Sequence, residues 1–367
     1  MPINCDVVVV GGGPAGFATA IGCAETGLRV NVLERSKFPR SCVGETVHPG
    51  VEPLFERLGI AEDVTKAQFV RHTGIWIKRG PDTEFVRFGG TPRRPWRGFQ
   101  LCRPEFDQIL MNRARKLGVR FIEGCVPSDA NSETGGVAVV TNMGIFRCKV
   151  VVDGTGRNRW LTHRWGLKVD AFSSTLIARF GYWEGECVSK HDNPTFTSRL
   201  DGWDWIARLK PNLYQWVSLN YREQKLALST VPAEFAKLRQ IGRLRGADVT
   251  WSLVRRPASS AHFLVGDAAA VLDPSSSHGI LRALSSGILA ATCIAKIIKG
   301  GSRNVRDITA GYDAWQRDWF LKDMNHLRML NHLVQPTAGN SYQGFPTARA
   351  HADSLSTFTS LAPGRCR

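Results

Sequence analysis

A run of four valines followed by a glycine-rich turn, residues 7–16, constrains the fold of this chain more than any other stretch. An unbroken run of β-branched residues is typical of a strand buried on both faces of a parallel sheet. Gly11, Gly13 and Gly16 then match the spacing G-x-G-x-x-G, and residues 17–25 can form a helix. In this pattern the first glycine allows a tight turn, the second admits a pyrophosphate, and the third lets helix pack on strand. The turn therefore predicts a dinucleotide-binding β-α-β unit.

The residues after the turn complete that unit. A second strand is expected at residues 29–33, and Glu34 at its end lies roughly twenty residues after the turn, where a carboxylate can hydrogen-bond a ribose hydroxyl. The N-terminus of the intervening helix offers free N–H groups and a partial positive charge to phosphates. The residues expected to hold the dinucleotide here are Gly11, Gly13, Pro14, Ala15, Gly16, Glu34 and Arg35.

Composition narrows the class of protein. The net charge of +16 favours anionic ligands such as a dinucleotide or an acidic protein, and no signature of a nucleic-acid-binding fold is present. No apolar run reaches the ~18 residues of a membrane span, and residues 1–5 leave no room for a signal peptide. The nine cysteines are scattered, without metal-binding spacing. We therefore expect a reduced, cytoplasmic protein with no integral membrane segment and no metal.

Hydrophobic periodicity predicts the remaining elements. Helices are expected at residues 48–60, 103–117, 279–299 and 305–333, a hairpin at 73–88, strands at 119–123 and 261–265, and a β-meander formed by 136–140 and 145–152. Between residues 161 and 254 the chain consists of short β-like runs at 174–180, 203–209 and 214–220, and this stretch holds six of the eleven tryptophans.

These elements predict an α/β fold: a Rossmann-like nucleotide-binding domain with an inserted β-sheet substrate domain and C-terminal helices. The nucleotide-binding domain is expected to comprise residues 1–160 and 255–335, and the substrate domain residues 161–254. Residues 70–100 are expected to add strands on the substrate side. Residues 336–367 are rich in Ser, Thr, Gly and Pro, which predicts a loosely ordered tail.

Several separate motifs follow one another in a recognisable order. After the first turn, a helix begins at Arg103, a strand ends at Asp153-Gly154, and a late strand ends at Gly266-Asp267, followed by residues 273–280 before a helix. This series resembles the FAD-dependent monooxygenase superfamily of the aromatic hydroxylase type, which includes flavin-dependent halogenases and geranylgeranyl reductases. The resemblance implies FAD as the cofactor, reduced by NAD(P)H or by an external reduced flavin, because no second dinucleotide fingerprint occurs.

The resemblance also implies FAD contacts beyond the first β-α-β unit. Arg103 would reach the pyrophosphate or ribityl chain, the backbone at Cys125 and Val126 would border the adenine, and Asp267 would hydrogen-bond a ribityl hydroxyl. The helix beginning at Gly279 would direct its positive end toward the flavin ring. The further cofactor-binding residues are Arg40, Gly44, Arg103, Cys125, Val126, Asp153, Gly154, Gly266, Asp267, Pro274, Gly279 and Ile280.

One subgroup of that superfamily is most similar. Residues 38–54, 202–206 and 273–280 resemble segments of the flavoproteins related to tryptophan halogenases. A halogenase of this type needs a lysine in an F-K-x-x-I-like stretch, whereas the nearest match here, residues 69–72, has Val70 at that place, and Lys66 and Lys78 lie elsewhere. This departure disfavours halogenation. The same subgroup contains maturases that hydroxylate a tryptophan of a partner protein.

The leading hypothesis is therefore an FAD-dependent monooxygenase that hydroxylates an indole or tryptophan through a flavin C4a-hydroperoxide. The favoured substrate is a tryptophan in an acidic partner protein during quinone cofactor biogenesis. The alternatives are a hydroxylase of a small aromatic molecule, a geranylgeranyl-reductase-like enzyme, a flavin-dependent halogenase, and a flavin redox carrier with no substrate chemistry of its own.

The catalytic candidates follow from these hypotheses. Glu45 or His48 could act as the base that removes the ring proton, and Cys42 could deliver protons in the reductase alternative. Trp203, Trp205 and His278 are expected to line the substrate cavity. Glu45 could instead pair with Arg40 or another cation, and both histidines could be structural.

Overall fold

The computed structural model describes residues 3–40, 44–187, 192–221, 231–300 and 304–334. Its centre is a parallel sheet, consistent with the valine run. In spatial order the strands are β11 (Arg120–Glu123), β3 (Val30–Glu34), β2 (Val7–Val10), β15 (Val150–Asp153) and β23 (His262–Leu264). All four residues of β2 are buried, and they alternate between two hydrophobic clusters, one on each face of the sheet. The predicted α/β fold is confirmed.

Helices cover one face of this sheet and a second sheet covers the other. The helices are α1 (Pro14–Glu25), α4 (Arg103–Lys116) and α6 (Gly279–Gly300). A Cβ atom at Gly287 would lie 2.5 Å from the Ala15 carbonyl oxygen, so the small residue lets α6 pack directly on α1. The covering sheet consists of β1 (Ile3–Asn4), β14 (Gly144–Cys148), β13 (Gly136–Thr141) and β12 (Pro127–Glu133).

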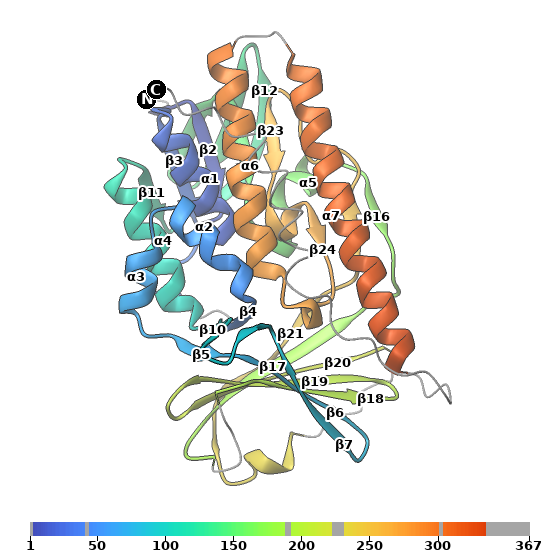
Figure 1. The fold of residues 1–367 in the computed structure, drawn as a ribbon. Helices are drawn as coiled ribbons and strands as arrows, with labels where there is room; N and C mark the ends of the chain where they lie inside the picture. Colours follow the sequence, from blue (N-terminus) through green and yellow to red (C-terminus); the bar gives the residue numbers. More distant parts are fainter. Residues whose placement is uncertain (1–2, 41–43, 188–191, 222–230, 301–303, 335–367) are drawn as a thin grey trace.

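A large, mostly antiparallel sheet lies at the far end of the molecule (Figure 1). Its strands, in spatial order, are β21 (Arg239–Asp248), β17 (Ile177–Glu184), β20 (Leu213–Asn220), β19 (Gly202–Lys210), β18 (Thr195–Arg199), β6 (Gly74–Arg79) and β7 (Asp82–Arg87). Strand β6 joins the sheet by pairing in parallel with β18. Residues 74–87 therefore do add strands to this sheet.

Smaller elements connect these layers. The short strands are β4 (Glu45–Val47), β10 (Gly98–Leu101) and β5 (Val70–His72) in one sheet, β16 (Val169–Ala171), β22 (Ser252–Val254) and β24 (Ala270–Val271) in another, and the pair β8 (Gly90–Thr91) and β9 (Arg94–Pro95). The remaining α-helices of the described chain are α2 (Glu52–Arg57), α3 (Ala61–Lys66), α5 (Trp160–Trp165) and α7 (Val305–Val334).

The last helix ties the two main sheets together. In Figure 1, α7 runs beside α6 and reaches down to the large sheet. Phe320, Met324 and Leu327 of α7 belong to the hydrophobic cluster that contains Trp203 and Trp205 of β19. Helix α6 is long and apolar enough to cross a membrane by composition, but 83% of its most apolar window is buried inside the protein. This burial is that of a core helix.

Most predicted elements are confirmed, including the hairpin β6–β7 and helices α4, α6 and α7. The helix predicted at 48–60 is confirmed over residues 49–57, where a 3-10 turn (Pro49–Val51) leads directly into α2. Gly59, at a left-handed φ of 65°, ends it before α3 begins. One prediction is wrong. The segment 145–152, predicted as one part of a meander, belongs to two sheets, because the extended strand is interrupted between the end of β14 and the start of β15. Residues 336–367 lie outside the described residues.

Candidate active site

A cavity of about 290 Å³ opens at the carboxyl ends of β2 and β3, where ligands of doubly wound sheets bind. We call it the nucleotide cavity. Of the residues predicted to hold the dinucleotide, its walls include Gly11, Gly13, Pro14, Ala15, Glu34, Arg35, Arg40, Arg103, Val126, Gly154, Gly266, Asp267, Gly279 and Ile280. The structure therefore brings together residues from seven separate stretches of the sequence.

The glycines of the first turn differ in what surrounds them. A Cβ at Gly16 would lie 2.0 Å from the Gly11 carbonyl oxygen, and one at Gly11 would lie 2.5 Å from that of Gly154. These two residues are glycines because backbone passes against backbone. At Gly13 the nearest atom to such a Cβ is an Arg40 nitrogen 3.5 Å away, so this position faces open space in the cavity. That is the cradle in which a pyrophosphate would run.

A network of charged side chains forms the floor between the turn and α4. Glu34 is 3% exposed; it accepts hydrogen bonds from the Gly12 and Ser36 amides and from Arg40 at 2.9 Å. Asp107, fully buried on α4, accepts from Arg40 and from two nitrogens of Arg103. The buried Nε of Arg40 has no partner in the described structure. The network presents guanidinium groups to the cavity while its acids hold them in place.

A second cavity of about 450 Å³ lies between this site and the large sheet, and we call it the aromatic cavity. Phe180, Trp203 and Trp205 form part of its wall, as predicted for the two tryptophans. Their indole nitrogens donate to Asp273 and Thr46 respectively, which fixes the rings. Pro274 and Gly44 also line it. The two cavities share Arg40, Glu45, Arg103, Thr155, Gly156, Asp267 and Gly279, so one ligand can extend from the first into the second.

Glu45 lies where the two cavities meet. Its side chain is 34% exposed, toward the cavity, and Arg103 approaches one carboxylate oxygen at 3.3 Å. Withdrawal from bulk water, against the opposing charge of Arg103 and with the help of the nearby Asp267, raises the pKa of Glu45 to about 7. A carboxyl with such a pKa can exchange a proton near neutral pH. The sequence-based alternative, a pair with Arg40 or another cation, is met by Arg103.

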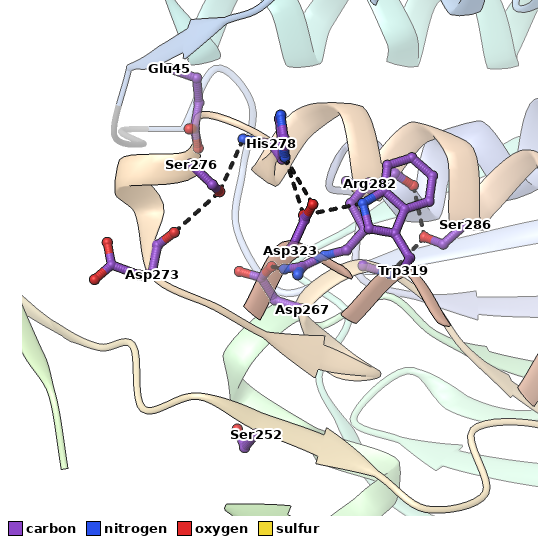
Figure 2. A network of polar contacts seen from close by, with 12 residues as sticks. Glu45, Ser252, Asp267, Asp273, Ser276, His278, Arg282, Ser286, Trp319 and Asp323 are labelled. Atoms are coloured by element: carbon purple, nitrogen blue, oxygen red, sulfur yellow. Dashed lines mark hydrogen bonds and ion pairs between the residues drawn. The ribbon is translucent and has the colours of Figure 1, made fainter. Parts of the chain in front are cut away.

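The turn before α6 is held by buried polar contacts (Figure 2). His278, which precedes the helix, is 8% exposed and its Nδ1 lies 3.2 Å from both carboxylate oxygens of Asp323 on α7, and Trp319 donates to the same carboxylate. Arg282, one turn into α6, pairs with Asp267 at 3.2 Å. His278 is directed at α7 and does not line the aromatic cavity, where the sequence had placed it. Its contacts with Asp323 fit the alternative of a structural histidine.

Four other predicted residues, Gly16, Asp153, Cys125 and His48, do not line the two cavities. Asp153 is fully buried, and its carboxylate accepts hydrogen bonds from Thr155 and the Leu161 amide, so it shapes the turn that carries Gly154. Cys125 is fully buried, and its amide donates to the Glu34 carbonyl. His48 accepts from the Gly50 amide and stacks edge-on with Phe88. Cys42 lies outside the described residues.

Sequence reasoning missed Asp107, Arg157, Arg245 and Arg282. Asp107 follows Arg103 by four residues on one helix, a spacing that brings side chains together and could have indicated the pair. The three arginines come from segments that only the folded chain brings to the aromatic cavity. Among the described residues, no group of three His, Cys, Asp or Glu side chains is arranged to hold a metal ion.

The residues present fit FAD. The Gly13 cradle, the unpartnered Arg40 Nε and Glu34 suit a pyrophosphate and a ribose, and the shared wall at Gly279 lets a ring system enter the aromatic cavity beside the start of α6. The positive end of that helix would stabilise negative charge on the ring.

Comparison with known proteins agrees with this geometry. The family model "Tryptophan halogenase" matches residues 6–102. A tryptophan 2-halogenase of Chondromyces crocatus is 29% identical over 82% of this chain, and the match spans 63% of the relative's length. The chain is therefore similar in sequence to flavin-dependent halogenases. FAD, the predicted cofactor, is supported both by this relationship and by the cavity.

Solved structures share the fold. The myxobacterial chondrochloren halogenase CndH, described as FAD-dependent, superimposes with a TM-score of 0.81 at 21% identity, covering 98% of this chain and 90% of that one. The peptidyl tryptophan dihydroxylase QhpG, which is essential for tryptophylquinone cofactor biogenesis, superimposes with a TM-score of 0.72 at 20% identity, covering 94% and 80%. One architecture thus carries both halogenation and hydroxylation, and this chain has the same fold.

Proposed function

We propose that this protein is an FAD-dependent enzyme that uses oxygen and a reductant to replace a hydrogen of an electron-rich aromatic ring by a hydroxyl group or a halogen, with release of the ring proton. The observation that supports this is the junction of the two cavities. A nucleotide cavity built around the glycine turn opens, at Glu45 and Gly279, into a cavity walled by Phe180, Trp203 and Trp205. A flavin ring placed at the junction would face an aromatic substrate in the second cavity.

Bound FAD would supply the activation of oxygen, which protein side chains cannot perform. The chain's own residues would do the rest. Trp203 and Trp205 position the substrate ring and exclude water, because they are 1% and 7% exposed and their indole nitrogens are held. Glu45 then accepts the proton that leaves the ring carbon after attack, and its raised pKa suits that task.

Halogenation is one form of this reaction, and the relatives support it at least as well as hydroxylation. The sequence favours hydroxylation on three grounds, the resemblance to the maturase subgroup, the missing lysine and the net charge of +16. The chain spans only 63% of the length of its halogenase relative named above, so the relative's activity comes to this protein as a proposal.

Hydroxylation is favoured by one feature of the site. Among the described residues that line the aromatic cavity there are five arginines and no lysine. Lys66 pairs with Glu62 on the surface, and Lys78 lies on β6 outside the cavity walls. The fold shared with QhpG extends this candidate to a tryptophan within a polypeptide, and the net charge of +16 would favour an acidic one.

One experiment separates the two forms. The purified protein is loaded with FAD, supplied with a flavin reductase and NADH, and given oxygen and an indole or a tryptophan-containing peptide, with and without bromide. Halide-dependent replacement of a ring hydrogen by bromine in the product mass would support halogenation, and halide-independent gain of oxygen would support hydroxylation. Consumption of reductant with no modified aromatic product under either condition, across indoles, phenols and pyrroles, would argue against the proposal.

A further inference from the structure

Two of the five arginines in the aromatic cavity belong to that cavity alone and form no ion pair with any described residue. Arg40 and Arg103 also line the nucleotide cavity and are held by Asp107, and Arg282 is held by Asp267. The other two are Arg157, on the turn after β15, and Arg245 on β21. The nucleotide cavity has its own cations, so the phosphates of the cofactor do not require these two.

Of the two, Arg157 already acts on an acidic side chain: its positive charge lowers the pKa of Glu45. Arg245 lies on the opposite side of the cavity, on the large sheet, and pairs across the ladder with Phe180. Arg245 is therefore a cation without an acidic partner among the described residues, directly beside an aromatic wall.

The position of β21 keeps that cation accessible. The strand forms an edge of the large sheet, and Arg245 is exposed to solvent. Phe180, its cross-strand neighbour, is 9% exposed and faces the cavity with Trp205. A molecule whose ring enters between these aromatic side chains would bring any group attached to the ring toward the guanidinium at the rim.

We propose that Arg245 binds an anionic group carried by the aromatic substrate, a carboxylate or a phosphate. The inference rests on the proposed function, because it names the chemical class of substrate that the aromatic cavity takes. A guanidinium presents two parallel N–H donors that match the oxygens of either anion. The overall charge of +16 would increase the rate of encounter with such a ligand. The anion could belong to a free aromatic acid or to a polypeptide that carries the aromatic residue.

Binding to the FAD-loaded, oxidised enzyme tests this without turnover. The probes are indole, indole-3-acetate, and two peptides in which a tryptophan is flanked by glutamates or by glutamines. Affinity is followed by the change in flavin absorbance or by calorimetry, at low and at high salt. We expect indole-3-acetate or the glutamate peptide to bind about fivefold tighter than its neutral counterpart in low salt. The preference should weaken as salt screens the pair.

Arg245→Gln should abolish that preference, and Arg245→Lys should retain part of it. Arg243→Gln is the matched control, because Arg243 is exposed on the same strand but does not line the cavity. Unchanged melting temperatures would show that all variants fold. If Arg245→Gln loses the preference for indole-3-acetate over indole, the anion belongs to a small molecule. If it loses only the preference for the glutamate peptide, the anion belongs to a polypeptide. Both results support the inference.

Equal affinity for charged and neutral probes in the wild type, or equal effects of Arg245→Gln and Arg243→Gln, would overturn it. These readouts do not depend on product formation. A preference that requires Arg245 in an enzyme that modifies no aromatic ring would contradict the proposed reaction and leave the anion site in place. If the enzyme instead modifies neutral and anionic rings with the same KM, the anion site is contradicted and the proposed reaction stands.

Discussion

Asp107 holds Arg40 and Arg103 with a single carboxylate, and the three side chains come from two distant parts of the chain. Arg103 donates from Nε at 2.9 Å and from a terminal nitrogen at 3.1 Å, and Arg40 donates at 3.1 Å. Asp107 is fully buried, whereas both arginines reach the nucleotide cavity. One carboxylate thus orients two cations toward the place where the cofactor phosphates would lie.

Replacing Asp107 by Asn should therefore damage both stability and cofactor binding. The amide keeps the shape of the side chain but removes the charge, and breaking a buried ion pair costs about 3–5 kcal/mol because the partner charges stay behind. We expect a clearly lower urea midpoint and weaker FAD retention on gel filtration. Glu105→Gln is the control: Glu105 lies on the same helix and pairs with Lys210 at the surface, so it should change stability by less than about 1 kcal/mol. Equal effects of the two variants would contradict this role of Asp107.

Glu45 should give the reaction a pH dependence near neutrality. Its pKa is raised to about 7, so the carboxyl is protonated below that pH and ionised above it. If the ionised form accepts the ring proton, kcat should rise with pH and level off above about 7. Glu45→Gln should lose this dependence and about 100-fold in rate. A wild-type profile that is flat from pH 5.5 to 8.5, with FAD bound throughout, would remove Glu45 from the base role.

The same residue predicts the direction of a stability change. Because the folded protein binds the Glu45 proton more tightly than the unfolded chain, the group stabilises the fold fully below its ordinary pKa of 4.5. That contribution is lost as the pH rises to about 7. The difference in melting temperature between wild type and Glu45→Gln should therefore shift across this window in favour of the variant. Its measurement needs only thermal denaturation in a series of buffers.

The two glycines of the first turn should respond differently to alanine. In Gly13→Ala the new methyl group meets no atom closer than 3.5 Å, so the apoprotein should fold with an almost unchanged melting temperature. The methyl would occupy the cradle, and FAD affinity should fall at least about tenfold. In Gly16→Ala the methyl would lie 2.0 Å from the Gly11 carbonyl oxygen, so the fold itself should be destabilised. Normal FAD binding by a stable Gly13→Ala protein would contradict the proposed path of the pyrophosphate.

Local patterns were sufficient to predict the nucleotide cavity. The valine run, the glycine spacing and Glu34 act within thirty residues, and each carries a geometric requirement that a sequence displays directly. The same holds for α6, whose apolar residues mark it as a core helix. Long-range neighbours were not predictable in this way. The partner of Glu45 proved to be Arg103, and that of His278 proved to be Asp323, 45 residues further along.

The failures share a physical cause. Asp153 and His278 stand in motifs that precede cofactor-binding turns, and a motif does not reveal which way a side chain points. Both are taken up by hydrogen bonds that shape the turn, while neighbouring backbone forms the cavity wall. Arg157, Arg245 and Arg282 come from three separate segments with no shared spacing, so no pattern in the sequence groups them at the aromatic cavity.

The contact between His278 and Asp323 should hold the start of α6 in place. Asp323 is 5% exposed and accepts from the buried His278 and the half-buried Trp319, so Asp323→Asn leaves both donors with a weaker acceptor (Figure 2). We expect a loss of about 1–3 kcal/mol in the free energy of unfolding. Asp318→Asn on the exposed face of the same helix is the control and should have little effect. If the turn from Asp273 to Gly279 orients the flavin ring, Asp323→Asn should also shift the absorbance spectrum of bound FAD, whereas Asp318→Asn should not. An unchanged spectrum together with unchanged stability would show that α7 does not position this helix end.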